Sequence, residues 1–139
     1  MSEASERGFI ATELVMGLGL LVFPVALLVL TLPGWSERQA TARVVAREVA
    51  RRAAREGVCD EVAAQSLGIA MARNLGVPPD SLEVAVLCPG GSDLVPGADV
   101  EARVTVRMPA VEIPGIGGVG AWSWTASHRE PVDRYGASP

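Results

Sequence analysis

The sequence predicts an α+β protein with one long N-terminal helix, a small antiparallel sheet and one additional short helix. Three observations lead to this class. Residues 14–36 form a run of 23 residues without a charged side chain. Residues 37–56 are rich in Arg and Ala, with apolar positions at helical spacing, and later segments alternate apolar with polar residues. Such alternation is typical of strands that bury one face and expose the other.

The first segment is long enough to cross a membrane. At about 1.5 Å of rise per residue, a helix of this length spans roughly 35 Å, and the hydrocarbon core of a bilayer is about 30 Å thick. Glu13 stands at the front edge of the run, and Pro24 is expected to kink the helix because proline lacks a backbone N–H. We therefore predict one transmembrane helix over residues 9–35, with the N-terminus in the cytoplasm.

Three explanations of this segment compete. An uncleaved signal anchor would only tether the chain. A cleavable secretory signal needs a positive leader and a small-residue site after the apolar run. Residues 1–8 instead carry two Glu and one Arg, and residues 32–35 offer no such site. The third explanation is a leader that is cleaved before the apolar helix, so that the helix stays in the mature protein.

The start of the chain resembles the leader and first helix of type IV prepilins. Arg7-Gly8-Phe9 is followed by three residues, then by Glu13 and the apolar run. The resemblance implies that residues 1–8 are a leader peptide and that a membrane peptidase cuts between Gly8 and Phe9. It also implies that Glu13 is the subunit-docking carboxylate. An acid is costly in lipid when unpaired, and the new amino terminus of a neighbouring subunit is a suitable partner.

The rest of the chain resembles one branch of that superfamily. Pro24 within the helix, the Arg/Ala-rich segment, a small β-rich domain and the stretch from His128 to Tyr135 are similar to TadE-like proteins. These are minor pilins, or pseudopilins, of the tight-adherence (Tad) type IV pilus system. The resemblance implies a pilin-like fold and a structural role in pilus assembly or adhesion. Leu14 follows Glu13 where the major pilins tend to carry Tyr, and the chain is long, which favours a minor subunit.

The resemblance also implies a set of partners. These are a prepilin peptidase, the major pilin, other pseudopilins, the platform membrane protein of the pilus, and membrane lipid. The expected location is the inner (cytoplasmic) membrane, crossed once, with residues 36–139 as an extracytoplasmic domain that can enter the extracellular pilus. The alternative, from another functional class, is a membrane-anchored extracytoplasmic binding domain that never joins a filament.

Two features bear on topology and oppose each other. Cys59 and Cys88 form an even pair, which predicts a disulfide in a domain outside the cytoplasm, with two buried free thiols as the alternative. Six arginines lie between residues 38 and 55, against one before the apolar run, and the positive-inside rule alone would keep this part in the cytoplasm. That rule weakens for long translocated domains, and glutamates are interspersed, so we place the domain outside.

The helical segments after the run follow from local signals. Pro33 and Gly34 are expected to interrupt the helix, and Ser36 to cap a second helical segment over residues 37–56 that stops at Gly57. The two segments together are expected to form one long bent rod. The buried stripe of that helix is predicted to be Val45, Val49 and Ala53, widened by Ala42, Ala46 and Ala50.

The remaining elements complete the domain. Asp60 is expected to cap a short helix over residues 61–74. Its buried side is predicted to be Ala63, Leu67, Ala70 and Met71. The predicted strands are residues 82–88, 99–108, 111–113 and 122–129, the third of them short and within a long loop, and residues 130–139 form a tail.

Composition argues against several functions. The net charge of −4 and an aromatic content of 4% give no reason to expect nucleic-acid binding. One His and two Cys are too few for a zinc site of the usual ligand types. His128 has no nucleophile motif such as G-x-S-x-G to work with. We therefore predict no catalytic residues, no metal and no cofactor.

Overall fold

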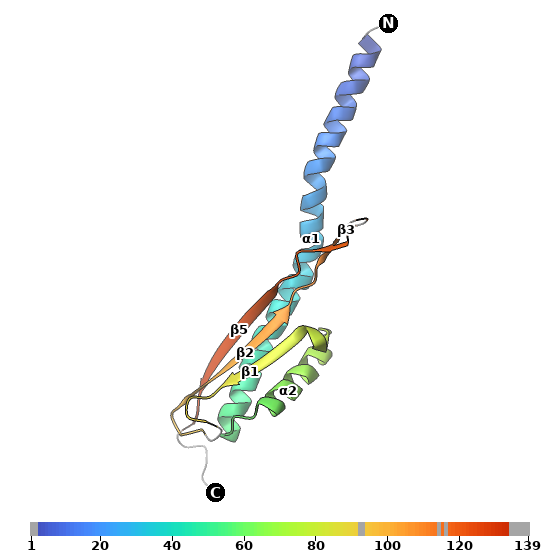
Figure 1. Ribbon diagram of the computed structural model, residues 1–139. Helices are drawn as coiled ribbons and strands as arrows, with labels where there is room; N and C mark the ends of the chain where they lie inside the picture. The colour runs from blue at the N-terminus through green and yellow to red at the C-terminus, as the bar shows by residue number, and fades with distance from the viewer. Residues whose placement is uncertain (1–2, 92–93, 114, 116, 134–139) are drawn as a thin grey trace. The chain divides into compact units, whose positions relative to one another are not determined.

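The computed structural model describes residues 3–91, 94–113, 115 and 117–133, with the backbone alone described for residues 3–11 and 112. The chain is an α+β protein, as predicted (Figure 1). It forms two compact units, Met1–Pro33 and Gly34–Pro139. The elements in chain order are helices α1 (Glu3–Glu56) and α2 (Glu61–Asn74), a single 3-10 turn η1 (Pro79–Ser81), and strands β1 (Leu82–Leu87), β2 (Asp99–Arg107), β3 (Val111–Ile113), β4 (Gly117–Val119) and β5 (Ser123–Pro131).

Helix α1 is continuous where an interruption was predicted. It contains both Pro24 and Pro33, so the predicted break at Pro33-Gly34 and the separate cap at Ser36 are wrong. Pro33 removes one backbone hydrogen bond and its ring crowds the carbonyl of Val29, which together cost about 3 kcal/mol in a helix interior, and a helical Gly costs about 1 kcal/mol relative to Ala. Packing of the following turn, in which Trp35 contacts the sheet unit, opposes that cost.

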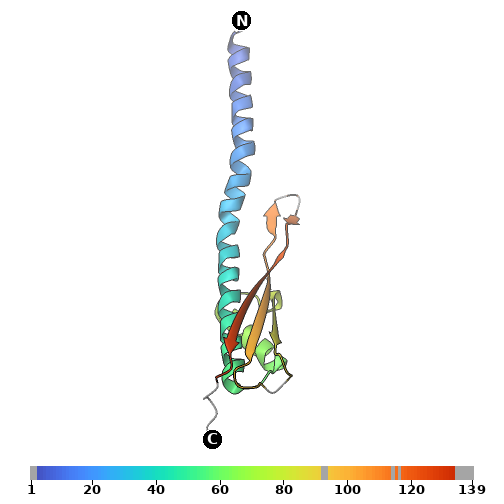
Figure 2. The ribbon, with the colours of Figure 1, turned by 90° about the vertical axis from the view of Figure 1, so that its left-hand side faces the viewer.

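The second unit has two layers, with helices on one face of a sheet (Figure 2). The sheet is antiparallel, in the order β1-β2-β5. Its register places Val84 beside Val104 and Val104 beside Ala126, so these side chains share one face. That face packs against α2 and the second part of α1.

The core confirms the predicted stripe of α1. Its six predicted residues are all buried, together with Thr41 and Ala54. The helix ends at Gly57, whose φ of 67° is a left-handed conformation that glycine adopts without strain. Because most of the stripe is alanine, the helix and sheet approach closely across it.

Helix α2 has the predicted limits, and its buried side was predicted in part, since Leu67 and Met71 pack against the core as expected. Ala64, Gly68 and Ala72 are buried, whereas Ala70 is exposed and Ala63 is half-buried. A Cβ at Gly68 would lie 2.5 Å from Cγ2 of Val84, so the helix touches the sheet through a residue without a side chain. The closest approach, not the largest side chains, sets the orientation of this helix.

The other face of the sheet is open to solvent. Glu101 on β2 accepts hydrogen bonds from Arg103 (2.7 Å) and from Arg129 on β5 (2.9 Å). The hydroxyls of Thr105 and Thr125 lie 2.9 Å apart across the same two strands. The wet face predicted from the alternation over residues 99–108 is therefore confirmed.

Two segments differ from the prediction near the C-terminal end. The predicted edge strand Val111–Ile113 is present, but it pairs with a second strand, Gly117–Val119, where a loop was predicted. Strand β5 extends to Pro131, and Val132 is buried, so the tail does not begin at residue 130. Both extensions depend on pairing partners that local sequence does not display. Residues 134–139, including Tyr135, lie outside the described residues.

Candidate membrane and assembly site

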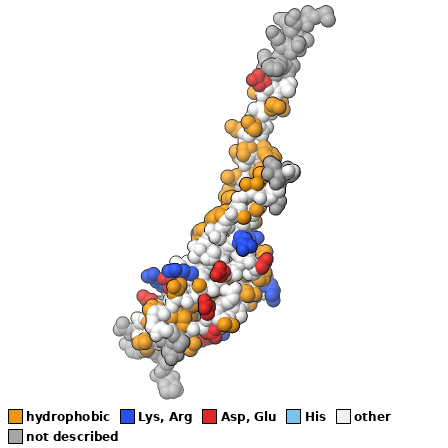
Figure 3. Space-filling model, viewed as in Figure 1, with side chains coloured by type: hydrophobic (Ala, Val, Ile, Leu, Met, Phe, Trp, Pro, Cys, Tyr) orange, Lys and Arg blue, Asp and Glu red, His pale blue; other side chains and the backbone are white. Residues whose placement is uncertain are grey.

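The first unit presents an apolar surface with one carboxylate. Apart from Leu27, which is half-buried, the large apolar side chains of residues 14–32 are exposed, from 47% at Leu32 to 81% at Leu20. By length and composition this helix can cross a membrane, which fits a single-pass membrane protein. Figure 3 shows hydrophobic side chains along this part of the chain, with most of the charged side chains on the second unit.

Glu13 lies on an otherwise apolar helix face. It shares a shallow groove with Leu14, Gly17, Leu18 and Leu21, which lie within about two turns on the same side. Glu13 is exposed, and a Cβ built at Gly17, one turn further on, would meet nothing within 4 Å. The carboxylate therefore stands next to a hollow in the helix surface, where another backbone can approach.

The sequence around Glu13 holds no basic side chain to pair with it inside a membrane. From Gly8 to Ser36, Glu13 is the one charged residue. An ionised carboxylate in lipid is costly, and such residues usually face a protein interior or an opposite charge. An opposite charge for Glu13 would therefore have to come from outside this segment.

The other predicted positions in this segment are only partly described. The backbone of Gly8 and Phe9 belongs to α1, and their side chains lie outside the described residues. The helix runs on through Pro24. Since proline has no N–H, the carbonyl of Leu20 lacks its usual helical donor, and the kink at Pro24 remains a prediction.

The hydroxyl of Thr31 shows how the apolar helix satisfies its polar groups. It lies 3.0 Å from the carbonyl oxygens of both Leu27 and Leu28, one turn earlier. Side-chain hydroxyls in membrane helices commonly bond to the backbone in this way. Among the residues of the apolar run, Glu13 is therefore the group whose burial in lipid would be hardest to satisfy locally.

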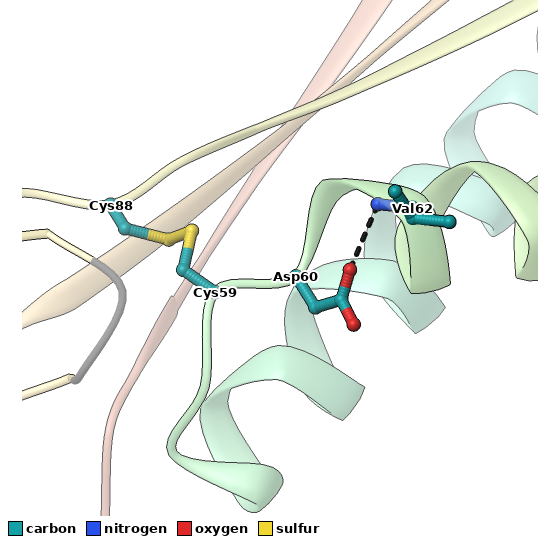
Figure 4. The surroundings of a disulfide bond; sticks show 4 residues. All are labelled: Cys59, Asp60, Val62 and Cys88. Atoms are coloured by element: carbon teal, nitrogen blue, oxygen red, sulfur yellow. Dashed lines mark hydrogen bonds between the residues drawn. A yellow bond between two sulfur atoms is a disulfide. The ribbon is translucent and has the colours of Figure 1, made fainter.

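Cys59 and Cys88 form the predicted disulfide (Figure 4). Their Cα atoms lie 6.3 Å apart, and the bond joins the turn after α1 to the segment after β1. Next to it, the carboxylate of Asp60 accepts hydrogen bonds from the backbone of Val62 (2.9 Å) and Ala63 (3.0 Å), which confirms the predicted cap. The alternative of two free thiols is excluded in this structure.

The arginine-rich side of α1 borders the edge strand β5. Arg43 lies over the ring of Trp124, 4.9 Å from its centroid, and Arg43 and Arg47 line a groove with residues 124–128. Arg52, in contrast, forms a helical ion pair with Glu56 at 2.8 Å. The arginines are thus divided between an aromatic contact, a local ion pair and solvent.

Two long-range contacts were not predicted from the sequence. The indole of Trp35 donates a hydrogen bond to the carbonyl of Pro109 at 3.2 Å, and its ring meets Trp122 edge-on at 5.9 Å. The side-chain amide of Gln65 accepts from the N–H of Val84 at 2.8 Å. Trp35 lies near the beginning of the domain's sequence and Trp122 near its end, and this occurrence of tryptophan is the one sequence signal that could have suggested the first contact.

No constellation suited to catalysis is evident in the part of the chain that the structure describes. His128 bonds to Glu130 at 3.1 Å, on the same strand. Within the described residues, no group of three or more His, Cys, Asp or Glu side chains could hold a metal ion. The described residues thus present an apolar helix that could cross a membrane, a carboxylate at its front edge, and a domain with a disulfide.

Comparison with models of known protein families, with curated proteins and with solved structures found no match.

Proposed function

We propose that this chain is a minor pilin, or pseudopilin, of a Tad-type IV pilus, a structural subunit that acts in pilus assembly or adhesion. The observation that carries the proposal is the placement of Glu13. From Gly8 to Ser36 it is the one charged residue, it is exposed among apolar side chains that are mostly exposed too in the described part of this segment, and it follows Gly8-Phe9 at the spacing of the prepilin motif. A membrane anchor alone would not need an acid at this position.

The proposal assigns a role to each part of the chain. Residues 1–8 are a leader removed by a prepilin peptidase, and the apolar helix holds the subunit in the inner membrane before assembly. In the filament, the same helix packs against the major pilin and other pseudopilins, after transfer by the platform protein. Glu13 pairs with the amino terminus of a neighbour. The disulfide supports an extracytoplasmic second unit, since such bonds persist in oxidising compartments.

The first test is the mass of the mature protein from its native cells. We expect the chain to begin at Phe9, with or without a methyl group on its amine. A chain that retains residues 1–8 would contradict the proposal and favour the membrane-anchored binding domain. A chain that begins beyond Leu32 would indicate a cleaved secretory signal.

The second test concerns the charge of Glu13. Glu13→Gln keeps the size of the side chain and removes its charge, whereas Glu13→Asp keeps the charge. We expect Glu13→Gln, like Glu13→Ala, to be cleaved normally but to be lost from sheared pili, measured by immunoblotting, and Glu13→Asp to retain part of the incorporation. Normal incorporation of Glu13→Ala would remove the docking role.

A cross-linking experiment identifies the partner of Glu13. The given sequence has no lysine, so within it the amino terminus, methylated or not, is the amine available for coupling to an activated carboxylate. Carbodiimide treatment of assembled pili should therefore couple Glu13 to the amino terminus of a neighbouring subunit, and mass spectrometry should identify the joined peptides. Their absence in Glu13→Gln pili is the matched control, and coupling of Glu13 to a lysine of another protein instead would contradict the proposed pairing.

A further inference from the structure

Within the second unit, Trp35 contacts two residues that lie far from it in the sequence. Its indole is hydrogen-bonded to the carbonyl of Pro109 and packs against Trp122. The backbone N–H of Met108 donates to the carbonyl of Trp122 at 2.7 Å, and the guanidinium of Arg38 donates to the carbonyl of Arg107. The end of β2, the start of β5 and this turn of α1 are thus fastened at one place.

The β3–β4 hairpin begins and ends at this place. Residues 109–122 contain four glycines, two prolines and a single charged residue, Glu112. In the part described, Val119 is 48% exposed and Trp122 is 40% exposed. Val111, Ile113 and Val119 belong to neither core cluster. A two-stranded hairpin has little stability of its own in water, and this one carries its apolar side chains outside the core.

The position of Trp35 along the chain relates this hairpin to the membrane. Trp35 follows Leu32, the last apolar residue of the run, by three residues, which span at most about 11 Å even when fully extended. When residues 14–32 cross a bilayer, Trp35 therefore lies in or beside the headgroup layer. Tryptophan is enriched in that layer, where its ring is apolar and its N–H can be satisfied. Trp122, in contact with Trp35, lies at a similar depth.

We propose that the β3–β4 hairpin and the Trp35–Trp122 pair form a second membrane-contacting surface, which lies in the interface of the bilayer that α1 spans. Its ligand is the boundary between headgroups and acyl chains. The hairpin has no Lys or Arg, so apolar burial and not attraction to anionic lipid supplies the binding. This inference rests on the membrane-spanning role of α1 and not on assembly into a pilus.

The test uses the full chain, one copy per nanodisc of phosphatidylcholine, with a nitroxide label on a single introduced cysteine. Val119→Cys reports the hairpin, and Ser127→Cys, on the solvent face of β5, is the matched control. The native cysteines are joined, so labelling without reductant leaves them unmodified. Power-saturation measurements compare collisions of the label with oxygen, which concentrates in lipid, and with a water-soluble nickel chelate.

We expect oxygen collisions to exceed nickel collisions at Val119→Cys and the reverse at Ser127→Cys. The inference is overturned if the label at Val119→Cys is as accessible to the nickel chelate as the label at the control position. It is also overturned if the label is shielded from both reagents, because that indicates contact with protein. A third label, Leu20→Cys, reports the span itself. If it is in lipid while the hairpin is in water, the hairpin inference fails alone. Because Val119 is exposed, its substitution should leave the circular dichroism spectrum unchanged.

Discussion

Glu101 on β2 pairs with two arginines on the solvent face of the sheet. Its side chain is 15% exposed and bonds to Arg103 and Arg129. The hydrogen bond from Arg103, followed by that from Arg129, holds the pKa of this carboxyl below its ordinary value of 4.5, and partial burial opposes the change only in part. The ionised form therefore stabilises the pairing of β2 with β5.

This coupling predicts a dependence of stability on pH. A carboxyl whose pKa is lowered by folding stabilises the native state fully above its unfolded pKa, and the contribution is lost as the pH falls through the folded pKa. We expect Glu101→Gln to be less stable than the parent above about pH 5 and the difference to shrink at lower pH. Urea unfolding followed by tryptophan fluorescence measures both. A difference that is the same at every pH would show that the charge of Glu101 is not the cause.

The range of each interaction along the chain decided which residue roles could be read from the sequence. Asp60 was identified as a cap because the backbone N–H groups that donate to its carboxylate lie within three residues of it. The partners of Trp35 and Gln65 lie 74 and 19 residues away, and no local pattern distinguishes these side chains from exposed ones. Cys59 and Cys88 were paired despite their separation only because the domain has two cysteines.

At the scale of elements, Gln65 shows how α2 protects the sheet. Strand β1 is an edge of the sheet, and the amide of Gln65 takes up the N–H of Val84 on it, with its own NH₂ 3.5 Å from the carbonyl of Leu82. The amide thus makes the hydrogen bonds that the backbone of a neighbouring strand would otherwise make. Unsatisfied edge groups are a common route to unwanted pairing, and this contact covers two of them.

The close packing of α2 on β1 predicts that Gly68→Ala is destabilising. Alanine favours a helix by about 1 kcal/mol over glycine, but its Cβ would lie 2.5 Å from Val84 and 3.3 Å from Leu82. Val84 is β-branched and buried, so it cannot move aside easily. We expect a net loss of about 1–3 kcal/mol in urea unfolding.

Ser66→Ala, on the exposed side of the same helix, is the matched control for this variant. It should change stability by no more than about 0.5 kcal/mol. A Gly68→Ala variant more stable than the parent would mean that helix propensity outweighs the contact.

Element types were predictable where periodicity was strong. The alternation in residues 99–108 and the spacing of small residues in α1 each determine which face is buried, and both were confirmed. The buried side of α2 was predicted only in part. Leu67 and Met71 pack against the core as expected, but Gly68 carries no hydrophobic signal, although its lack of a side chain is what brings the helix against Val84. Pro33 and Gly34 indicated a break, and tertiary contacts outweighed that local preference.

At the scale of the whole molecule, the apolar run and the two-layer domain are separate units, and the disulfide lies entirely within the second. The bond closes a loop with a sequence separation of 29 residues. Cross-links of this size restrict the unfolded chain and contribute on the order of 3–4 kcal/mol in the chain-entropy model. For a domain this small, that is a large share of the total stability.

We therefore expect the double variant Cys59→Ser, Cys88→Ser to lose about 3–4 kcal/mol of unfolding free energy. All three tryptophans lie in the second unit, so their fluorescence in detergent follows its unfolding. The parent with reductant should match the double variant without it. No response of the parent to reductant would mean that the bond does not limit the unfolded state.

Because of the same bond, the two ends of the second unit differ in how they resist a pulling force. A pull transmitted through Gly34 first reaches the contacts of Trp35, which are all noncovalent. At the opposite end of the helix, the chain is tied covalently to the strand side three residues after Glu56. Under such a pull the contacts of Trp35 carry the load first, whereas the sulfur bridge keeps residues 59 and 88 together however far the rest of the chain is stretched. We therefore expect the segments joined through Trp35 to separate before those joined through the disulfide.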